Sequence, residues 1–383
     1  MEYLGITQAQ LETAGGYWTA REIAQQPAVW LDVERLMARE DTALRTHLDP
    51  LLRRQELRVV LTGAGTSAFV GECLAPALNR AGLSAAGIST TDLVAAPDRW
   101  LNRVPTLLVS FARSGNSPES VAALQLAEQC LHECHHLIFT CNPDGLLRRR
   151  GQDAKNAHVV LLPAETNDRG FAMTSSFSGM LLAAASAFGL MRDLRAASLA
   201  EWGGQILDAA IPCSATLAHA GFERVIFLGS NECKGLAREA ALKMLELSDG
   251  RVVTLAETPL GFRHGPKTIV TSSTLVVLFM CNDPYTRRYE LDVLKELRTD
   301  GVAARVVAVG AASGEGRASA DQIDVHGATS APDLALCLVY ALFAQVLAFQ
   351  QSLACGLRPD LPNTKGVVSR VVQGFTIYPW SAQ

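Results

Sequence analysis

The sequence has no excess of positive charge, and no segment rich in lysine and arginine stands out. Its 383 residues include 34 Lys plus Arg and 38 Asp plus Glu, which gives a net charge of -4. A nucleic-acid-binding protein concentrates basic side chains, so we expect no nucleic-acid partner. Low-complexity segments are also absent, and 49% of the residues are hydrophobic. This composition excludes a disordered tail, a collagen and a coiled coil, and indicates a globular protein with a sizeable core.

A secretory signal is not found at the start of the chain either. The opening MEYLGITQAQLETAGG has no basic start followed by an apolar stretch. The nine cysteines are scattered and odd in number, which is typical of a reduced chain with free thiols. We therefore expect a cytoplasmic protein.

One apolar stretch, residues 334–349, raises the question of a membrane segment. It covers 16 residues and is interrupted by Gln345, whereas a spanning helix needs about 20 residues. We predict a buried helix in the core or at a subunit interface, and no membrane partner.

The chain contains two similar blocks. Residues 58–71 read RVVLTGAGTSAFVG and residues 224–237 read RVIFLGSNECKGLA. Each is an apolar run that ends in glycine, followed by small polar residues and a helical pattern. Similarity at this separation predicts two copies of one unit.

Further apolar runs alternate with helical patterns such as residues 118–130. This alternation predicts an α/β fold with parallel sheets covered by helices on both faces. The segment before the first block shows helical patterns without strand alternation. We expect a helical segment at 1–55 and domains at 56–200 and 201–383. The other buried strands are expected at residues 106–110, 137–141, 159–162, 275–280 and 305–309.

Two loops of the first block have the residues of an anion site: GAGTS at 63–67 and SGNSPE at 114–119. Ser117 suits an N-cap and Pro118 the first helical position. Helix starts expose unpaired N–H groups, and nearby Arg113 could add a charge-assisted bond. Each loop alone is also explained as a capped turn. Two of them at strand C-terminal ends predict a phosphate site.

Nucleotide cofactor motifs do not fit these loops. After Gly63 and Gly65 the next glycine is Gly71, so the G-x-G-x-x-G spacing fails, and residues 229–235 lack the GK[ST] ending of a P-loop. We expect no cofactor.

A second candidate site lies in the other half of the chain. Glu239, Lys243 and Glu246 form one stripe of an otherwise mostly apolar helix. Buried charges must pair or line a cavity, so the stripe is either a structural ion-pair ladder or a carboxylate base tuned by lysine. His264, in the loop GFRHGPK, suits proton transfer near neutral pH, and Lys365 lies in a C-terminal loop.

The segment CLHECHH at residues 130–136 is rich in metal-ligand types. Its spacing matches no zinc pattern, and adjacent His135 and His136 cannot easily face one ion. We interpret it as a surface helix end that leads into a strand, and expect no metal.

The motifs GAGTS, SFARSGNSPES, EAALKMLE and RHGP, with a terminal asparagine–lysine pair, resemble the sugar isomerase (SIS) family. Their order is similar to the isomerase half of glucosamine-6-phosphate synthase over roughly residues 20–383. SFARSGNSPES with GFRHGPK is most similar to the AgaS branch, the galactosamine-6-phosphate deaminase/isomerases. The resemblance implies two tandem SIS domains, each a flavodoxin-like five-stranded parallel sheet, in a homodimer or higher homo-oligomer with sites shared between subunits.

The resemblance also implies roles for the phosphate loops. Ser67, Ser114 and Ser117 would hold the sugar phosphate, with Thr66 nearby. Arg113 stands where the synthase pattern has glutamine.

The remaining roles belong to the second half of the chain. Glu246 would be the base that moves a proton between C1 and C2, supported by Lys243 and Glu239. His264, from the partner chain, would open the sugar ring. Lys365 would lie at the carbonyl or amino end.

These roles define the expected reaction. The short segment before the first block leaves no room for an ammonia-supplying domain, so we expect conversion of galactosamine 6-phosphate to tagatose 6-phosphate and ammonia. A tagatose-6-phosphate ketose/aldose isomerase, a glucosamine-6-phosphate deaminase and a non-catalytic sugar-phosphate sensor remain alternatives.

Overall fold

The computed structural model describes residues 1–312, 321–366, 368–370, 374 and 376–381. They form two compact units, each built around one parallel sheet. Each unit combines segments that are not contiguous in the sequence. The contiguous domain division into 1–55, 56–200 and 201–383 stays a prediction. The N-sheet unit comprises Val29–Asn167, Ser175–Arg192 and Gly366–Gln383, and the C-sheet unit comprises Met1–Ala28, Asp168–Thr174 and Asp193–Lys365.

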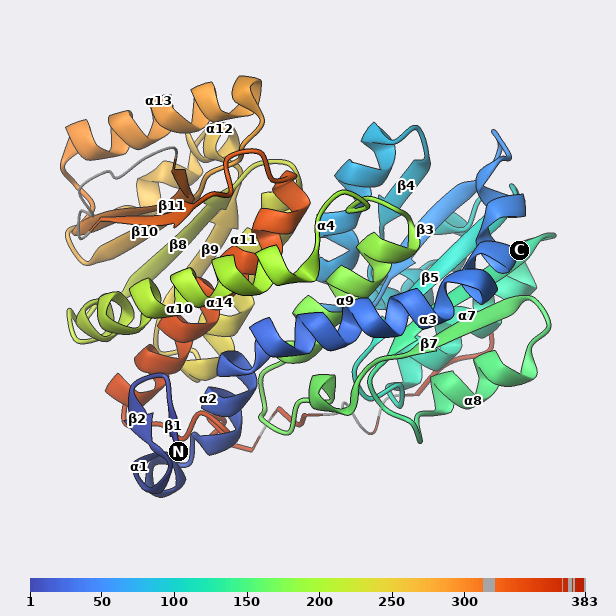
Figure 1. The fold of residues 1–383 in the computed structure, drawn as a ribbon, viewed down its shortest axis with the longest axis horizontal. Helices are drawn as coiled ribbons and strands as arrows, with labels where there is room; N and C mark the ends of the chain where they lie inside the picture. Colours follow the sequence, from blue (N-terminus) through green and yellow to red (C-terminus); the bar gives the residue numbers. More distant parts are fainter. Residues whose placement is uncertain (313–320, 367, 371–373, 375, 382–383) are drawn as a thin grey trace. The chain divides into compact units, whose positions relative to one another are not determined.

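The N-sheet has five parallel strands in the order β4-β3-β5-β6-β7 (Figure 1). All seven residues of its central strand β5 are buried, as expected for an apolar strand covered on both faces. The strands are β3 (Arg58–Thr62), β4 (Ser84–Gly87), β5 (Thr106–Ala112), β6 (Cys134–Thr140) and β7 (Ala157–Leu161).

Helices cover both faces of the N-sheet. On one face α4 (Thr66–Arg80) packs against α9 (Ser175–Ala187), and Trp30 of α3 (Gln26–Leu52) donates a hydrogen bond to Ser178 of α9. On the other face, apolar residues of three helices pack with Val60 and Leu108: α5 (Thr90–Ala95), α7 (Pro118–Cys130) and α8 (Leu146–Asp153). The short helix α6 (Pro97–Trp100) contacts α5 and α7.

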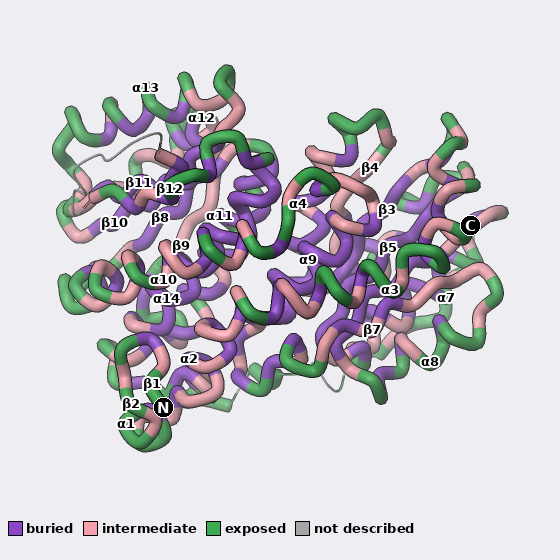
Figure 2. Tube along the Cα trace, in the orientation of Figure 1, coloured by how far each residue is buried: buried purple, intermediate pink, exposed green. Residues whose placement is uncertain are grey.

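The C-sheet is also wholly parallel, in the order β9-β8-β10-β11-β12. Its strands follow one another along the chain in the same pattern as those of the N-sheet, with the second strand at one edge. They are β8 (Arg224–Gly229), β9 (Val253–Glu257), β10 (Thr274–Phe279), β11 (Arg305–Ala312) and β12 (Gln322–His326). In Figure 2 the inner strands of both sheets are largely purple, which marks buried residues.

The C-sheet is covered by α10 (Ala196–Ala218), α11 (Glu232–Leu247) and α14 (Asp333–Ala354) on one face. Helices α12 (Pro259–Phe262) and α13 (Pro284–Asp300) pack on the other. By length and composition α14 could cross a membrane, but 89% of its most apolar window is buried inside the protein. The predicted buried helix at residues 334–349 is therefore confirmed.

The segment at 1–55 differs from the purely helical prediction. It includes a two-stranded antiparallel pair, whose strands of two residues each are too short to show an alternating pattern. The elements are β1 (Glu2–Tyr3), β2 (Ile6–Thr7), α1 (Gln8–Ala14), α2 (Tyr17–Ala24) and α3. Short 3-10 turns at Ala164–Thr166 and Pro266–Ile269 complete the described elements.

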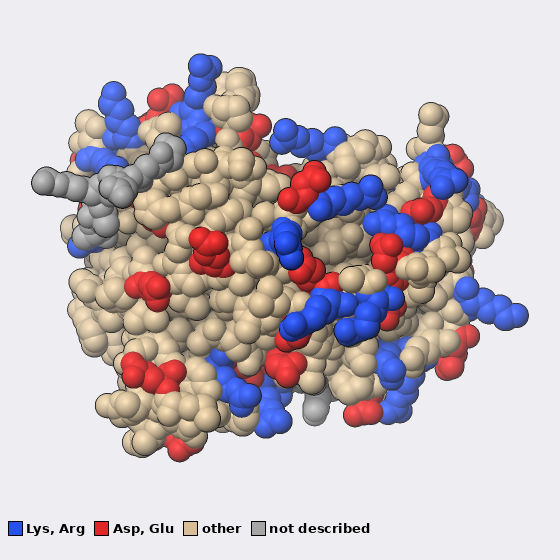
Figure 3. Space-filling model, viewed as in Figure 1, with Lys and Arg blue, Asp and Glu red and all other residues tan. Residues whose placement is uncertain are grey.

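Acidic and basic side chains are interspersed on the face shown in Figure 3. No broad field of a single sign is present on that face, in keeping with the small net charge.

Candidate functional site

The first predicted phosphate loop leads from β3 into α4. Thr66 and Ser67 are the first two residues of α4, and both are buried. Gly63 lies so close to the helix that an added Cβ would be 2.5 Å from the backbone carbon of Ser67, and Gly65 has a φ of +56°. The two glycines thus allow a tight turn that places the α4 N-terminus at the end of β3.

The second predicted loop leads from β5 into α7. Ser117 occupies the N-cap position and Pro118 the first helical position, as predicted. The Ser117 hydroxyl lies 2.6 Å from the Ser120 hydroxyl rather than capping the helix. The Ser114 hydroxyl accepts a hydrogen bond from Asn116 N at 3.3 Å. Hydroxyl groups and helix N–H groups are therefore concentrated in one short loop.

The two loops lie at the same edge of the N-sheet. Strands β3 and β5 are adjacent and parallel, with Thr62 opposite Ser110, so their C-terminal ends meet. The first-turn N–H groups of α4 and α7 have no intrahelical acceptor, and the helix dipoles add positive potential there. This edge is suited to bind a phosphate.

Arg113 directly precedes the second loop, and its side chain is almost fully buried. Its guanidinium Nη2 donates a hydrogen bond of 3.1 Å to the backbone carbonyl of Arg370. The structure thus connects Arg113 to the C-terminal tail of the N-sheet unit, a contact that the sequence does not predict. A role for Arg113 toward an anion remains a prediction.

The equivalent turn of the C-sheet has the same backbone form. Asn231 has a φ of +50°, close to that of Gly65 in the N-sheet. A Cβ added at Gly229 would lie 2.6 Å from the backbone carbon of Cys233, and a Cβ added at Gly63 would lie 2.5 Å from that of Ser67. Both strand–turn–helix segments thus bring the helix close enough to exclude a side chain.

Backbone donors at this edge of the C-sheet are occupied by the chain's own carboxylates. Asp333 accepts hydrogen bonds from the amides of Asn282 and Asp283 at 2.5 and 3.4 Å. Glu290 accepts one from Cys281 N at 2.8 Å. At this edge of the C-sheet, side-chain carboxylates accept the backbone N–H hydrogen bonds that a bound phosphate would otherwise accept.

The predicted stripe on α11 is an ion-pair ladder. The Lys243 ammonium Nζ lies 2.5 Å from Glu246 Oε2 and 3.7 Å from Glu239 Oε1. Lys243 and Glu239 are buried, whereas 26% of the Glu246 side chain is exposed. The ladder therefore fixes one carboxylate at the protein surface by means of a buried lysine.

The segment that carries Lys365 is attached near the end of α11. The Thr364 hydroxyl donates a hydrogen bond of 2.8 Å to Asp249 Oδ2, and Asp249 follows the last residue of α11 by two positions. Asn363 Oδ1 accepts a hydrogen bond from Lys365 N. The exposed Lys365 is thus attached to the end of the helix that carries Glu246.

His264 is exposed on the turn after α12. Among the described residues, no hydrogen bond or ion pair joins its side chain to the ladder. The loop location is as expected, and its role remains a prediction.

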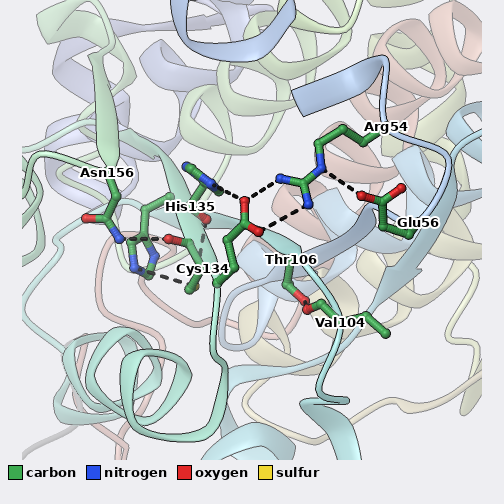
Figure 4. Close-up of polar contacts among 9 residues, drawn as sticks. Arg54, Glu56, Val104, Thr106, Cys134, His135 and Asn156 are labelled. Atoms are coloured by element: carbon green, nitrogen blue, oxygen red, sulfur yellow. Dashed lines mark hydrogen bonds and ion pairs between the residues drawn. The ribbon is translucent and has the colours of Figure 1, made fainter. Parts of the chain in front are cut away.

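The CLHECHH segment begins at Cys130, the last residue of α7, and leads into a strand, as predicted, but the strand begins three residues earlier than the expected residue 137. Strand β6 begins at Cys134, so His135 and His136 are part of the sheet, and His136 is fully buried. Burial, with nearby histidines, lowers the pKa of His136 to about 4. Glu133, just before the strand, pairs with Arg54 and His135, both of which are labelled in Figure 4. Among the described residues, no group of three or more His, Cys, Asp or Glu side chains is placed to hold a metal ion.

One buried acidic cluster was missed in the sequence. Glu22 accepts hydrogen bonds from the amides of Arg169 and Gly170, and its pKa is raised to about 8 by burial and then by the charge of Asp168. Asp360 accepts hydrogen bonds from Trp18 N and Thr19 N. The cluster joins three segments of the C-sheet unit that are far apart in sequence, so no local pattern reveals it.

No family model matches the chain, but close relatives exist. The chain is 50% identical over 365 residues to a Streptomyces coelicolor protein provisionally named D-galactosamine-6-phosphate deaminase AgaS, covering 94% of this chain and 95% of that one. It is 43% identical over 374 residues to the D-galactosamine-6-phosphate deaminase AgaS of Escherichia coli O157:H7, covering 96% and 97%. The crystal structure of tagatose-6-phosphate ketose/aldose isomerase from Escherichia coli matches with a TM-score of 0.88 and 40% identity, over 98% of this chain and all of that one.

Proposed function

This chain belongs to the AgaS family of sugar isomerase (SIS) proteins, and we propose that it converts D-galactosamine 6-phosphate and water to D-tagatose 6-phosphate and ammonia. The observation that carries the proposal is the Glu246 carboxylate, held by buried Lys243 and partly open to solvent. A general base needs this combination of fixed orientation and access to the substrate. The free state of all nine cysteines supports a cytoplasmic enzyme.

We interpret the two sheets as tandem SIS domains, supported by their identical strand order and by the matched turns at Gly63 and Gly229. In this proposal the N-sheet copy binds the phosphate through Ser67, Ser114 and Ser117, with Thr66 beside them. The C-sheet copy, where Asp333 occupies backbone donors, does not bind phosphate.

The proposed reaction begins with the open-chain aldehyde of the substrate. Glu246 removes the proton from C2 while the C1 oxygen gains a proton, which forms an enolamine. Return of a proton to C1 leaves a ketiminium at C2. Water adds to C2, the C2–N bond breaks, and ammonia leaves the C2 ketone of tagatose 6-phosphate. The amino group itself activates C2, so the steps require no metal or redox cofactor.

The other residues take supporting roles in this proposal. Lys243 and Glu239 orient Glu246. Lys365, attached through Thr364 to the end of α11, lies at the carbonyl or amino end of the sugar. His264 assists ring opening, and its exposed turn suits contribution across the interface of a homodimer or higher homo-oligomer.

Ammonia release from galactosamine 6-phosphate by the purified protein tests the assignment of the base. We expect Glu246→Gln to lower kcat by about 10²–10⁴-fold with little change in KM, because the amide cannot accept the C2 proton. Glu201→Gln, the same change at an exposed residue of α10, should leave kcat unchanged. Full activity of Glu246→Gln would refute Glu246 as the base.

The phosphate loops are tested by affinity. The double variant Ser114→Ala and Ser117→Ala removes two hydroxyl donors, so we expect KM to rise by at least about tenfold. Ser84→Ala, an exposed serine of β4, is the control. An unchanged KM in the double variant would place the phosphate elsewhere.

Simple aldose–ketose isomerisation is the second candidate, favoured by the name of the Escherichia coli structure. Both reactions begin with proton removal at C2 of the open-chain sugar. Product analysis separates them, because ammonia forms only in the deamination. A protein that binds the sugar phosphates without turning them over would instead be a sensor.

A further inference from the structure

The C-terminal tail is docked on the N-sheet unit. Ile377 and Trp380 pack against the apolar core formed by residues such as Leu93 and Leu101. Further back in the tail, the Arg370 carbonyl accepts the hydrogen bond from Arg113. These contacts hold the tail on this unit, and the apolar contact lies on the side of α5 and α7.

A cavity lies beside the docked tail. Its volume is about 720 Å³, which is within the range of small-molecule sites, about 300–1,000 Å³. Residues 379–381 of the tail form one wall, and residues 95–103 and the end of α7 form the others. Because these segments directly precede β5 and β6, the cavity is at the opposite edge of the N-sheet from the phosphate loops.

Two guanidinium groups line this cavity. Neither Arg99 nor Arg103 forms an ion pair or side-chain hydrogen bond with any part of the chain that the structure describes. Asp98 is the acidic side chain among the lining residues, so the lining carries a net positive charge. Guanidinium groups bind phosphate through paired N–H donors.

The remaining lining groups suit a polyhydroxylated ligand. The amides of Asn102 and Gln129 and the hydroxyl of Ser381 can donate to and accept from hydroxyl groups. The Trp380 indole supplies an apolar surface for the C–H groups of a sugar chain. We propose that this cavity is a second ligand site, which binds a phosphorylated polyol of hexose size with its phosphate at Arg99 and Arg103.

Calorimetric titration with glucitol 6-phosphate tests this site. This hexitol phosphate has no carbonyl or amino group, so the enzyme cannot turn it over. We expect two binding sites per chain in the unmodified protein. The double variant Arg99→Ala and Arg103→Ala should weaken one of them by at least about tenfold and leave the other, whereas Arg149→Ala with Arg150→Ala, at exposed positions of α8, should retain both.

The tail wall is tested with the same ligand. Trp380→Ala should weaken the same site, and Tyr378→Ala, at a neighbouring side chain that is 79% exposed, should not. The variant Ser114→Ala with Ser117→Ala should keep the cavity site, which separates it from the phosphate loops. A single site in the unmodified protein, or two unchanged sites in the Arg99/Arg103 variant, would overturn the proposal.

Discussion

Among single residues, Lys243 has the most constrained environment at the candidate site. Its ammonium lies between the buried carboxylate of Glu239 and the partly exposed carboxylate of Glu246. Loss of one partner from a buried ion pair leaves an uncompensated charge, which is more costly than removal of both partners.

This asymmetry predicts the stability of Lys243 variants. Lys243→Met should lower the free energy of unfolding by about 3–5 kcal/mol, because Glu239 remains buried without its cation. Adding Glu239→Gln should recover part of that loss. Urea unfolding of the single and double variants measures both values. If the double variant is less stable than Lys243→Met, the carboxylate is not the source of the penalty.

Glu22 predicts a pH dependence of stability. Its folded-state pKa of about 8 is above its ordinary value of 4.5, so between these pH values the folded protein holds a proton that the unfolded chain has released. The stabilisation is complete below pH 4.5 and is lost as the pH rises through 8. Relative to Glu22→Gln, the unmodified protein should lose up to about 1.4 kcal/mol per pH unit in this window.

Thermal or urea unfolding at several pH values between 5 and 8.5 checks this prediction. Glu201→Gln is the matched control, since its exposed carboxylate should not change the pH profile. Parallel profiles for the unmodified protein and Glu22→Gln would contradict the raised pKa of Glu22.

Whether the sequence alone could group interacting residues depended on how far apart they lie along the chain. Glu239, Lys243 and Glu246 share one helical stripe, so the 3.6-residue period was enough to group them. Glu22, Asp168 and Asp360 come from three remote segments, and only the fold brings them together. The hydrogen bond between Arg113 and Arg370 was missed for the same reason.

Among secondary-structure elements, burial determined which strands the sequence revealed. The predicted inner strands β3, β5, β6, β8, β10 and β11 are apolar and largely buried. Of the edge strands, β7 was predicted from its apolar run. The others were missed: β4 is SAAG, and β9 and β12 mix polar and apolar residues. Each has at least one exposed residue, so the continuous apolar signal of a parallel strand is absent.

The matched turns of the two sheets provide a test of the phosphate loop. Gly63→Ala and Gly229→Ala both place a Cβ within 2.6 Å of the following helix, so each should destabilise the protein by about 1–3 kcal/mol. Gly63→Ala alone should also raise KM for the sugar phosphate, because only its turn presents Thr66 and Ser67.

Denaturation and steady-state kinetics on the two variants measure these effects separately. Gly229→Ala is the control for backbone strain without a phosphate site. An equal rise of KM in both variants would mean that the effect comes from general distortion rather than from the first loop.

At the level of the whole molecule, the sequence predicted the α/β class and the parallel sheets but not the exchange of the chain ends. The segment Met1–Ala28 belongs to the C-sheet unit, and the segment Gly366–Gln383 belongs to the N-sheet unit. Hydrogen bonds from Trp18 and Thr19 to Asp360 hold the N-terminal end in its unit, and Ile377 and Trp380 hold the C-terminal end in the other. Neither contact follows from a local pattern.

This crossed arrangement means that no single break in the chain separates two complete units. A fragment of residues 1–192 would keep the surface on which Trp380 docks but lack Trp380 itself, and it would carry α2 without Asp360. A fragment of residues 193–383 would have the converse defects. We expect each fragment to be insoluble or unfolded when expressed alone and to recover a cooperative unfolding transition when both are co-expressed. Independent folding of either fragment, measured by circular dichroism, would mean that the exchanged ends are dispensable.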